Sequence, residues 1–376
     1  MMVVVMVLLQ SCGSPSHVTS TTRPPAKVFS PIQDVSGNIS GYLPFGLACS
    51  SQYYCLAIVR SAPSVSSQPD PLSGLSTLIT TTNGWKTSSE VNEPGMIAKI
   101  SCVSSSTCIL LLQEGVIQSA TYAVAQTSEL IQGQVVNGEW TFSSPVTIPA
   151  TMPYEFTCLD VSKCLIITSQ EEVQLSTDSG KTWQSETTLP SGYRPLQIAC
   201  LLISANCFTL LQSISSGGEI FEISTDGGLT WKAEYSLGKL AANYVSCPNV
   251  NFCVAVVTQV TSPGGYLLYT SNDFGKSWRI EKTSSPLGAV SDFICSSDTL
   301  CFAGSSSLNA ISLSSSNSAE VTRLAYAKLH QYGNDIFGTQ SGFSCPSSQF
   351  CYLTDATSMS GFHIDKVGFT LPGSSS

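Results

Sequence analysis

Closely spaced cysteines are the strongest chemical pattern in this chain, because all of its 15 cysteines except Cys12 fall into pairs. Five residues separate the two members of a pair, except in the fourth pair, where six do. Thiols at this spacing can form a disulfide across a tight turn, or they can bind a metal ion. The pairs are Cys49 with Cys55, Cys102 with Cys108, Cys158 with Cys164, Cys200 with Cys207, Cys247 with Cys253, Cys295 with Cys301, and Cys345 with Cys351.

Disulfide bonding is the interpretation that we favour for these pairs. Zinc sites prefer closer cysteine spacings and often use histidine, whereas His17, His330 and His363 are the only histidines and none adjoins a pair. Closing a loop of about seven residues removes denatured-state entropy worth about 2 kcal/mol in the simple chain model. We therefore expect each pair to be a disulfide within one repeat, with no metal and no other cofactor.

A second motif follows three of the pairs. The segments STDSGKTW (176–183), STDGGLTW (224–231) and SNDFGKSW (271–278) share the pattern Ser-x-Asp-x-Gly-x-Thr/Ser-Trp. The Asp can accept N–H bonds within its own turn, the Gly can adopt positive φ, and the Trp can anchor the next strand. We assign a structural role, and no catalytic one, to Asp178, Gly180, Trp183, Asp226, Gly228, Trp231, Asp273, Gly275 and Trp278.

Both motifs recur with a period of about fifty residues, since the first cysteines of the pairs stand at 49, 102, 158, 200, 247, 295 and 345. Weaker forms of the second motif, each without the Asp, stand at 80–87, 135–140 and 313–318. The fifth repeat contains the strand-like segments NYVSC, CVAVVTQ, YLLYTS and WRIEK. Four short strands in about fifty residues are typical of a β-propeller blade.

The sequence thus predicts an all-β fold, a seven-bladed β-propeller of four-stranded blades with one disulfide hairpin in each blade. We expect it to occupy residues 28–372, followed by a tail at 373–376. The last repeat has only a short final strand, so we expect a strand from AKVFSPI (26–32) to complete its blade.

The Ser-x-Asp-x-Gly-x-Thr/Ser-Trp segments resemble the Asp-box, or BNR, repeat of sialidase-like propellers. The same unit resembles that of the photosystem II assembly-factor propellers, and SCPNVNFCVAV (246–256) is similar to repeats common in secreted actinobacterial proteins. The resemblance covers nearly the whole chain from residue 28 and implies the propeller fold. It implies little about activity, because one fold hosts many kinds of site.

The N-terminal residues indicate export. The apolar run MMVVVMVLL has about the length of a signal-peptide core and is too short to span a bilayer as a helix. LQSCGSPS (9–16) resembles a bacterial lipobox, which implies lipidation of Cys12, although Gln10 departs from the usual pattern and no basic residue precedes the run. A plain secretory signal with a leftover cysteine is the alternative. We expect a signal peptide at 1–11 and a lipid-anchored flexible tether at 12–27.

Composition and missing motifs narrow the function. A net charge of -9 with only 16 Lys and Arg argues against nucleic acid. The sequence has no GxSxG, P-loop or HExxH motif. Sialidases grip the substrate carboxylate with three arginines, and outside the tether and an expected outer strand only Arg60, Arg194 and Arg323 remain. A secreted glycoside hydrolase with paired carboxylates and non-sialidase chemistry remains the alternative function.

The preferred prediction is a non-catalytic scaffold that binds a protein or glycan of the cell envelope. We expect this protein to be a monomer that contacts the membrane only through the lipid anchor. We expect it on the outer face of the cytoplasmic membrane or on the cell surface, or secreted. In a propeller the Asp boxes share a face with the turns between strands one and two, and ligands usually bind the other face. Polar candidates there include Glu93, Tyr244, Asp292 and Asp335, and our best guesses at binding residues are Tyr154, Glu155, Tyr193 and Arg194.

Overall fold

The computed structural model describes most of the chain from residue 28 onward. The described residues are 28–29, 33–61, 76–92, 95–114, 117–118, 123–124, 127–149, 155–168, 170–201, 204–215, 218–238, 241–258, 265–287, 290, 292–304, 308–314, 318–325, 342–347, 349–358 and 361–370. The predictions for Cys12, Glu93, Tyr154 and Asp335 lie outside these residues. The described residues contain no helix, and therefore none that is long and apolar enough to cross a membrane.

The strands form mainly antiparallel sheets, each named here after its innermost strand. The β4 sheet contains β4 (Tyr42–Cys49), β5 (Cys55–Ser61), β6 (Ser76–Thr81) and β7 (Ser89–Asn92). The β8 sheet contains β8 (Met96–Ser104), β9 (Thr107–Glu114), β12 (Thr127–Val136), β13 (Glu139–Phe142) and β14 (Val146–Ile148). A separate small ribbon pairs β10 (Ile117–Gln118) with β11 (Ala123–Val124).

The next sheets are regular meanders. The β15 sheet contains β15 (Glu155–Cys158), β16 (Cys164–Ile167), β17 (Glu172–Ser176) and β18 (Gln184–Thr188). The β19 sheet contains β19 (Tyr193–Cys200), β20 (Cys207–Ser213), β21 (Glu219–Ser224) and β22 (Lys232–Gly238). The β23 sheet contains β23 (Ala241–Asn249), β24 (Phe252–Thr258), β25 (Tyr266–Ser271) and β26 (Arg279–Thr283). The β27 sheet contains β27 (Asp292–Ser297), β28 (Leu300–Gly304), β29 (Leu308–Ser314) and β30 (Ser318–Ala325). A short parallel pairing of β26 with β30 joins it to the β23 sheet, so that the two form one eight-stranded sheet.

The last sheet combines both ends of the chain. The β31 sheet contains β31 (Phe343–Ser347), β32 (Phe350–Ser358) and β33 (Gly361–Thr370), with β1 (Val28–Phe29), β2 (Gln33–Asp34) and β3 (Ile39–Ser40) paired along the outer edge of β33. Val28 pairs with Thr370 and Phe29 with Phe369. The predicted closing strand within residues 26–32 is confirmed by this pairing.

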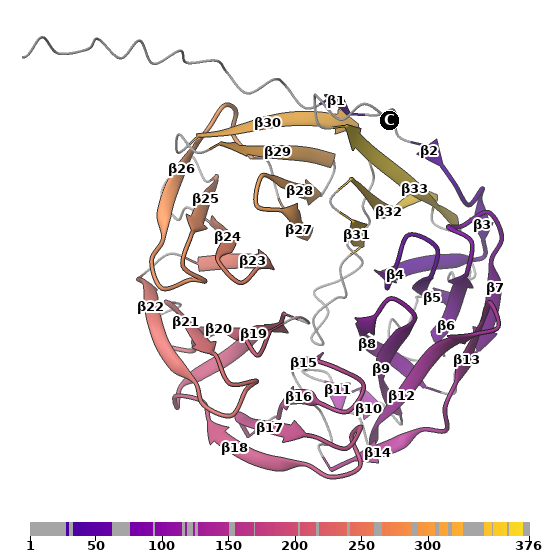
Figure 1. The fold of residues 1–376 in the computed structure, drawn as a ribbon, viewed down its shortest axis with the longest axis horizontal. Helices are drawn as coiled ribbons and strands as arrows, with labels where there is room; N and C mark the ends of the chain where they lie inside the picture. Colours follow the sequence, from indigo (N-terminus) through magenta and orange to yellow (C-terminus); the bar gives the residue numbers. More distant parts are fainter. Residues whose placement is uncertain are drawn as a thin grey trace, which may run out of the picture.

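The sheets stand around a common axis, with the strand that gives each sheet its name innermost and the opposite edge of the sheet at the rim (Figure 1). This arrangement is that of a β-propeller. Each hydrophobic cluster lies between two neighbouring sheets, and one of them joins the β31 sheet to the β4 sheet. The core is therefore distributed around the ring, which closes because its two ends bury apolar surface against each other.

Serines just before the cysteines link the innermost strands of neighbouring sheets. Each of these hydroxyls accepts a hydrogen bond from the backbone N–H of a cysteine on the next sheet around the ring. The links run from Cys158 to Ser101 (3.1 Å), from Cys295 to Ser246 (2.9 Å) and from Cys49 to Ser344 (2.8 Å). An inner-edge N–H that lacks a strand partner is thereby satisfied. This explains the Ser that precedes Cys in these three repeats.

Candidate functional site

The cysteine pairs lie across the first hairpin of each sheet. Within the described residues, all seven predicted pairs are disulfides, with Cα–Cα distances between 3.8 and 4.1 Å. The bonds join Cys49 to Cys55, Cys102 to Cys108, Cys158 to Cys164, Cys200 to Cys207, Cys247 to Cys253, Cys295 to Cys301, and Cys345 to Cys351. The prediction of one disulfide within each repeat is therefore confirmed for every pair.

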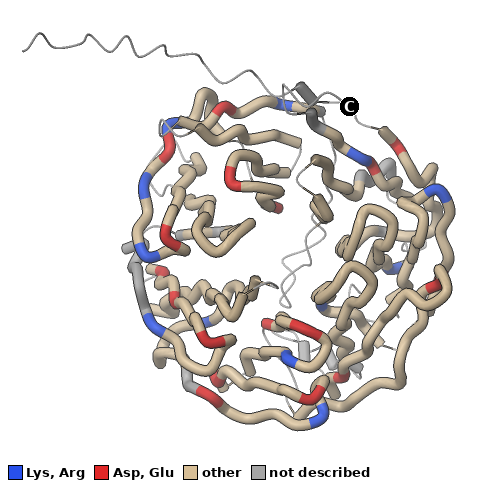
Figure 2. Tube along the Cα trace, viewed as in Figure 1, with Lys and Arg blue, Asp and Glu red and all other residues tan. Residues whose placement is uncertain are grey.

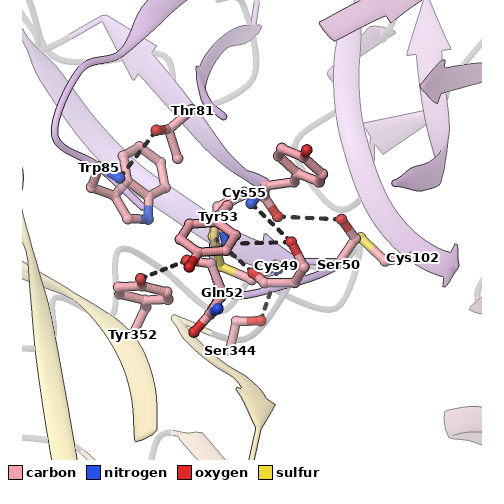
Figure 3. The surroundings of a disulfide bond; sticks show 12 residues. Cys49, Ser50, Gln52, Tyr53, Cys55, Thr81, Trp85, Cys102, Ser344 and Tyr352 are labelled. Atoms are coloured by element: carbon pink, nitrogen blue, oxygen red, sulfur yellow. Dashed lines mark hydrogen bonds between the residues drawn. A yellow bond between two sulfur atoms is a disulfide. The ribbon is translucent and has the colours of Figure 1, made fainter. Parts of the chain in front are cut away.

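The first of these disulfides illustrates their geometry. In the β4 sheet, Cys49 is the direct cross-strand partner of Cys55. Figure 3 shows this disulfide, with Ser344 reaching the backbone of Cys49 from the β31 sheet. The cysteines thus have a structural role, and no group of three or more metal-ligating side chains occurs in the described part of the chain.

The Asp boxes form closed hydrogen-bonded turns between the third and fourth strands. In the first box, the Asp178 carboxylate accepts hydrogen bonds from the backbone N–H of Thr182 (2.8 Å) and from its hydroxyl (2.6 Å). The Ser176 hydroxyl donates to Asp178 and accepts from the N–H of Gly180. The Thr182 hydroxyl and backbone bonds lower the pKa of Asp178 to about 2. The carboxylate is therefore occupied within its own turn.

The glycine of each box packs against the preceding sheet. Gly180, Gly228 and Gly275 have φ values of +84°, +93° and +85°. A Cβ atom at Gly180 would lie 2.6 Å from the Leu130 side chain, and one at Gly228 would lie 2.6 Å from Leu165. Both a left-handed backbone and close contact with a neighbouring sheet therefore require glycine here.

The boxes contact the turns between strands one and two of their own sheets. Backbone bonds join Ser179 to Ser162 (2.9 Å) in the β15 sheet and Gly227 to Ala205 (2.7 Å) in the β19 sheet. These two kinds of turn therefore form one face of the ring, as predicted, and we call it the Asp-box face. The opposite face lies at the other ends of the strands, where β19 begins and β20 ends.

Glu155 differs from its prediction as an exposed binding contact. It is the first residue of β15, and only 4% of its surface is exposed. Its carboxylate accepts a hydrogen bond from the Lys99 ammonium (2.6 Å) and another from the Ile198 backbone N–H (3.3 Å). Burial raises the pKa of Glu155, and Lys99 acts against that rise. Because its partners lie on the β8 and β19 sheets, Glu155 is a link within the ring.

Arg194, in contrast, is exposed on the opposite face at the start of β19. Its Nε and Nη2 both donate to the Gln212 side-chain oxygen, at 3.0 and 2.5 Å. The Gln212 amide in turn donates to Glu219 (3.2 Å). Tyr193 is half-buried and packs against the apolar cluster between the β15 and β19 sheets. The side chain of Tyr193 is therefore packed in the core, whereas that of Arg194 is exposed. In the described residues no hydrogen bond joins either side chain to Glu155.

Glu219 completes this group, which we call the Arg194 cluster: Arg194, Gln212 and Glu219. Only 1% of Glu219 is exposed, and its carboxylate also accepts a hydrogen bond from the Ala242 backbone N–H on the β23 sheet. Burial raises its pKa to about 7, although the bonds from Ala242 and Gln212 and the Arg194 charge act in the other direction. Sequence reasoning missed Glu219, because nothing in GGEIF marks its carboxylate as buried.

The remaining described candidates also join neighbouring sheets. Asp292 accepts a hydrogen bond from the backbone N–H of Gly342 (2.6 Å) at the start of the β31 sheet. Burial, Asp292 and Tyr266 together raise the pKa of Tyr244 to about 12. Lys and Arg residues are spread around the ring and are not gathered in one segment of the trace (Figure 2). The exposed guanidinium that this site orients is that of Arg194, which can bind a carboxylate or another anion.

Comparisons with known proteins agree with this architecture. Residues 222–233 match the model of the BNR/Asp-box repeat. No curated protein matches the chain in sequence. Among solved structures, Kuenenia stuttgartiensis hydrazine synthase has a TM-score of 0.58 at 9% identity, with 91% of this chain and 98% of that chain covered.

Two further solved structures are similar to this chain. YCF48 bound to D1 peptide has a TM-score of 0.56 at 11% identity, with 91% of this chain and 95% of that chain covered. The GH74 xyloglucanase from Xanthomonas campestris has a TM-score of 0.49 at 10% identity, with 79% of this chain covered. This chain spans 56% of the length of that enzyme. At 9% and 11% identity, the likeness to hydrazine synthase and to YCF48 shows the fold alone.

Proposed function

We propose that this protein is a non-catalytic, exported lipoprotein whose propeller is a binding or assembly scaffold for a protein or glycan. Residues 1–11 are the signal peptide, 12–27 the lipidated tether, 28–372 the propeller and 373–376 a tail. The observation that carries the proposal is the contrast on the opposite face. Glu155, Glu219 and Asp292 are engaged in links between sheets, whereas Arg194 is exposed and oriented.

The platform is a ring of seven blades, each with one disulfide hairpin. The proposal is supported by the disulfides of the described residues, each of which joins the two strands of one hairpin at the inner edge of a sheet. The β23 and β27 sheets count separately, because only a short parallel pairing of Lys282 and Thr283 with Ser318 and Ala319 joins them at the rim. Such disulfides persist in oxidising compartments, which supports an extracellular location.

Arg194 is the best candidate contact for the partner. Gln212 holds one edge of its guanidinium, and in the described residues no carboxylate bonds to it directly. Guanidinium groups recognise carboxylates through charge-assisted hydrogen bonds. Ile214, with 67% of its surface exposed, follows β20 on the same face. A cation near an exposed apolar side chain suits a protein segment that carries an acidic and an apolar residue. Because this surface is preformed, the free-energy cost of ordering it on binding is small.

Capture from the intact cell envelope tests the proposal. Arg194→Gln should weaken partner capture by about 10-fold or more, because a charge-assisted hydrogen bond contributes about 1.5–3 kcal/mol. Arg323→Gln is the matched control, since Arg323 is exposed on the outer strand β30. Equal capture by both variants would show that the site assignment is wrong. If the purified protein hydrolysed glycosides and Glu219→Gln abolished that activity while the fold persisted, the glycoside hydrolase alternative would replace the scaffold.

A further inference from the structure

The N-terminal strand fixes the face of the ring at which the chain enters. In each regular sheet the third strand runs toward the Asp-box face, as β17 does when it ends at Ser176, where the first Asp box begins. β33 is the third strand of the β31 sheet and ends at Thr370. Because Val28 pairs with Thr370 and Ile39 pairs with Phe362, the chain enters at the Asp-box face and proceeds toward the opposite face. β1 lies at the outer rim (Figure 1).

Exposed apolar side chains lie on that same face. Tyr53 and Val161 occupy turns between first and second strands, and 53% and 41% of their surfaces are exposed. Leu229, in the second Asp box, has 42% of its surface exposed. On the opposite face, Ile214 is the one large apolar side chain within the described residues that is exposed. Apolar tips on protruding turns can enter the interfacial region of a bilayer.

The position that Leu229 holds in its box is occupied by lysine in the related turns. Lys181 and Lys276 occupy the equivalent position of the other two boxes, and Lys86 occupies it in the turn of the β4 sheet, all three exposed. Long lysine side chains can extend toward lipid headgroups. In the first and third boxes, an ionised Asp in the same turn offsets the charge of the lysine. Electrostatic attraction alone therefore does not hold this face to a membrane, and an anchor has to supply the affinity.

We infer that the Asp-box face is the membrane-facing side of the protein, with Tyr53, Val161 and Leu229 at the level of the lipid headgroups. This inference rests on the proposed lipid anchor at Cys12. It also explains why a partner would meet the opposite face, which then points away from the membrane.

Photo-crosslinking to lipid tests the orientation on the full-length lipidated protein. The protein is placed in vesicles of phosphatidylethanolamine and phosphatidylglycerol, with p-benzoylphenylalanine replacing Tyr53, Leu229 or, as the control, Ile214. Ile214 is the most exposed of the three, so a difference in simple accessibility would favour the control. We expect several-fold more lipid crosslinking from positions 53 and 229 than from 214. Vesicle flotation of the same samples, with Cys12→Ser beside them, measures anchoring separately.

The two readouts distinguish the two ideas. Flotation that depends on Cys12, with crosslinks from the Asp-box face, supports both. Flotation with equal or stronger crosslinking from position 214 overturns the orientation and leaves the anchor intact. Protein that fails to float, or floats equally well as Cys12→Ser, overturns the anchor and the orientation that rests on it. Intact disulfides in each variant, measured by non-reducing peptide mapping, show that the fold has been retained.

Discussion

The turn of the β4 sheet and the first Asp box form the same hydrogen bonds with different residues. In the Asp box, Asp178 accepts from both the backbone and the hydroxyl of Thr182. In the β4 sheet, Asn83 accepts from the Thr87 backbone (2.9 Å) and donates to the Thr87 hydroxyl (2.7 Å). An amide can thus replace the carboxylate when one hydroxyl bond reverses its direction. Closing the turn therefore needs two hydrogen bonds, which either a carboxylate or an amide can provide.

The two turns differ most at the position of the glycine. Trp85 stands there in the β4 sheet, with φ of 69° and only 1% of its surface exposed. Its backbone N–H donates to the Thr81 hydroxyl (3.0 Å), as that of Gly180 donates to Ser176 (2.8 Å). In the Asp boxes a side chain of the preceding sheet occupies the space, whereas in the β4 sheet Trp85 itself fills the interface with the β31 sheet. The space that the neighbouring sheet leaves at this position therefore determines whether glycine or a larger residue fits there.

The largest expected effect is that of Trp85→Ala. This change removes a buried aromatic side chain from the contact that closes the ring, which typically costs about 3–5 kcal/mol, so we expect a loss of that size in the free energy of unfolding. Denaturant unfolding measures it. Leu229→Ala is the control, because its side chain is exposed and the change should stay within about 0.5 kcal/mol. A loss below about 1 kcal/mol for Trp85→Ala would contradict the assignment of Trp85 to the core.

Gly228→Ala should be next in size. Its new Cβ would combine a left-handed backbone with a clash against Leu165, for an expected loss of about 2–4 kcal/mol. Gly227→Ala is a matched control with φ of +79° and its nearest neighbour at 3.6 Å. It should therefore lose only the backbone part, about 1–2 kcal/mol. Equal losses for the two variants in thermal or denaturant unfolding would show that packing against the β15 sheet is unimportant.

Ser224→Ala should have a smaller effect. The buried Ser224 hydroxyl accepts a hydrogen bond from the Gly228 N–H (2.8 Å) and donates to Asp226 (2.7 Å). Leaving that N–H without its partner should cost about 1–3 kcal/mol. Thr81→Val should cost a similar amount in the β4 sheet, where the Thr81 hydroxyl has the same role. If only one of the two variants were destabilised in denaturant unfolding, the turns would not be equivalent.

The smallest expected effect is a difference in acid titration. The pKa of Asp178 falls from 3.8 to about 2 in the folded protein, so its contribution to stability is present above the unfolded value and is lost as pH falls through about 2. Asn83 has no ionisable group. The NMR amide shift of Thr182 should therefore change with a midpoint near 2, and that of Thr87 should not. Asp178→Asn should remove the Thr182 titration, and its persistence in that variant would assign it to another group.

Local patterns gave the predictions that agree with the structure. A cysteine pair six positions apart lies across one hairpin, and the residues of an Asp box bond within one turn, so neighbouring residues decide both. Local patterns could not predict the burial or the partners of Glu155 and Glu219. Their partners include Lys99 on another sheet, 56 positions away, and Ala242, 23 positions away. Burial and pKa of these carboxylates follow from contacts that only the closed ring creates.

The sequence by itself determined the repeat, the disulfide hairpins, the Asp-box turns and the need for a closing strand, because short-range geometry and period-two alternation specify these features. Only the tertiary structure decided that Trp85 can occupy a glycine position, that Glu155 is a link and not a contact, and that the chain enters at the Asp-box face. These three outcomes depend on packing between sheets distant in the sequence. Such packing exists only after the ring has closed and the interfaces between sheets have excluded water.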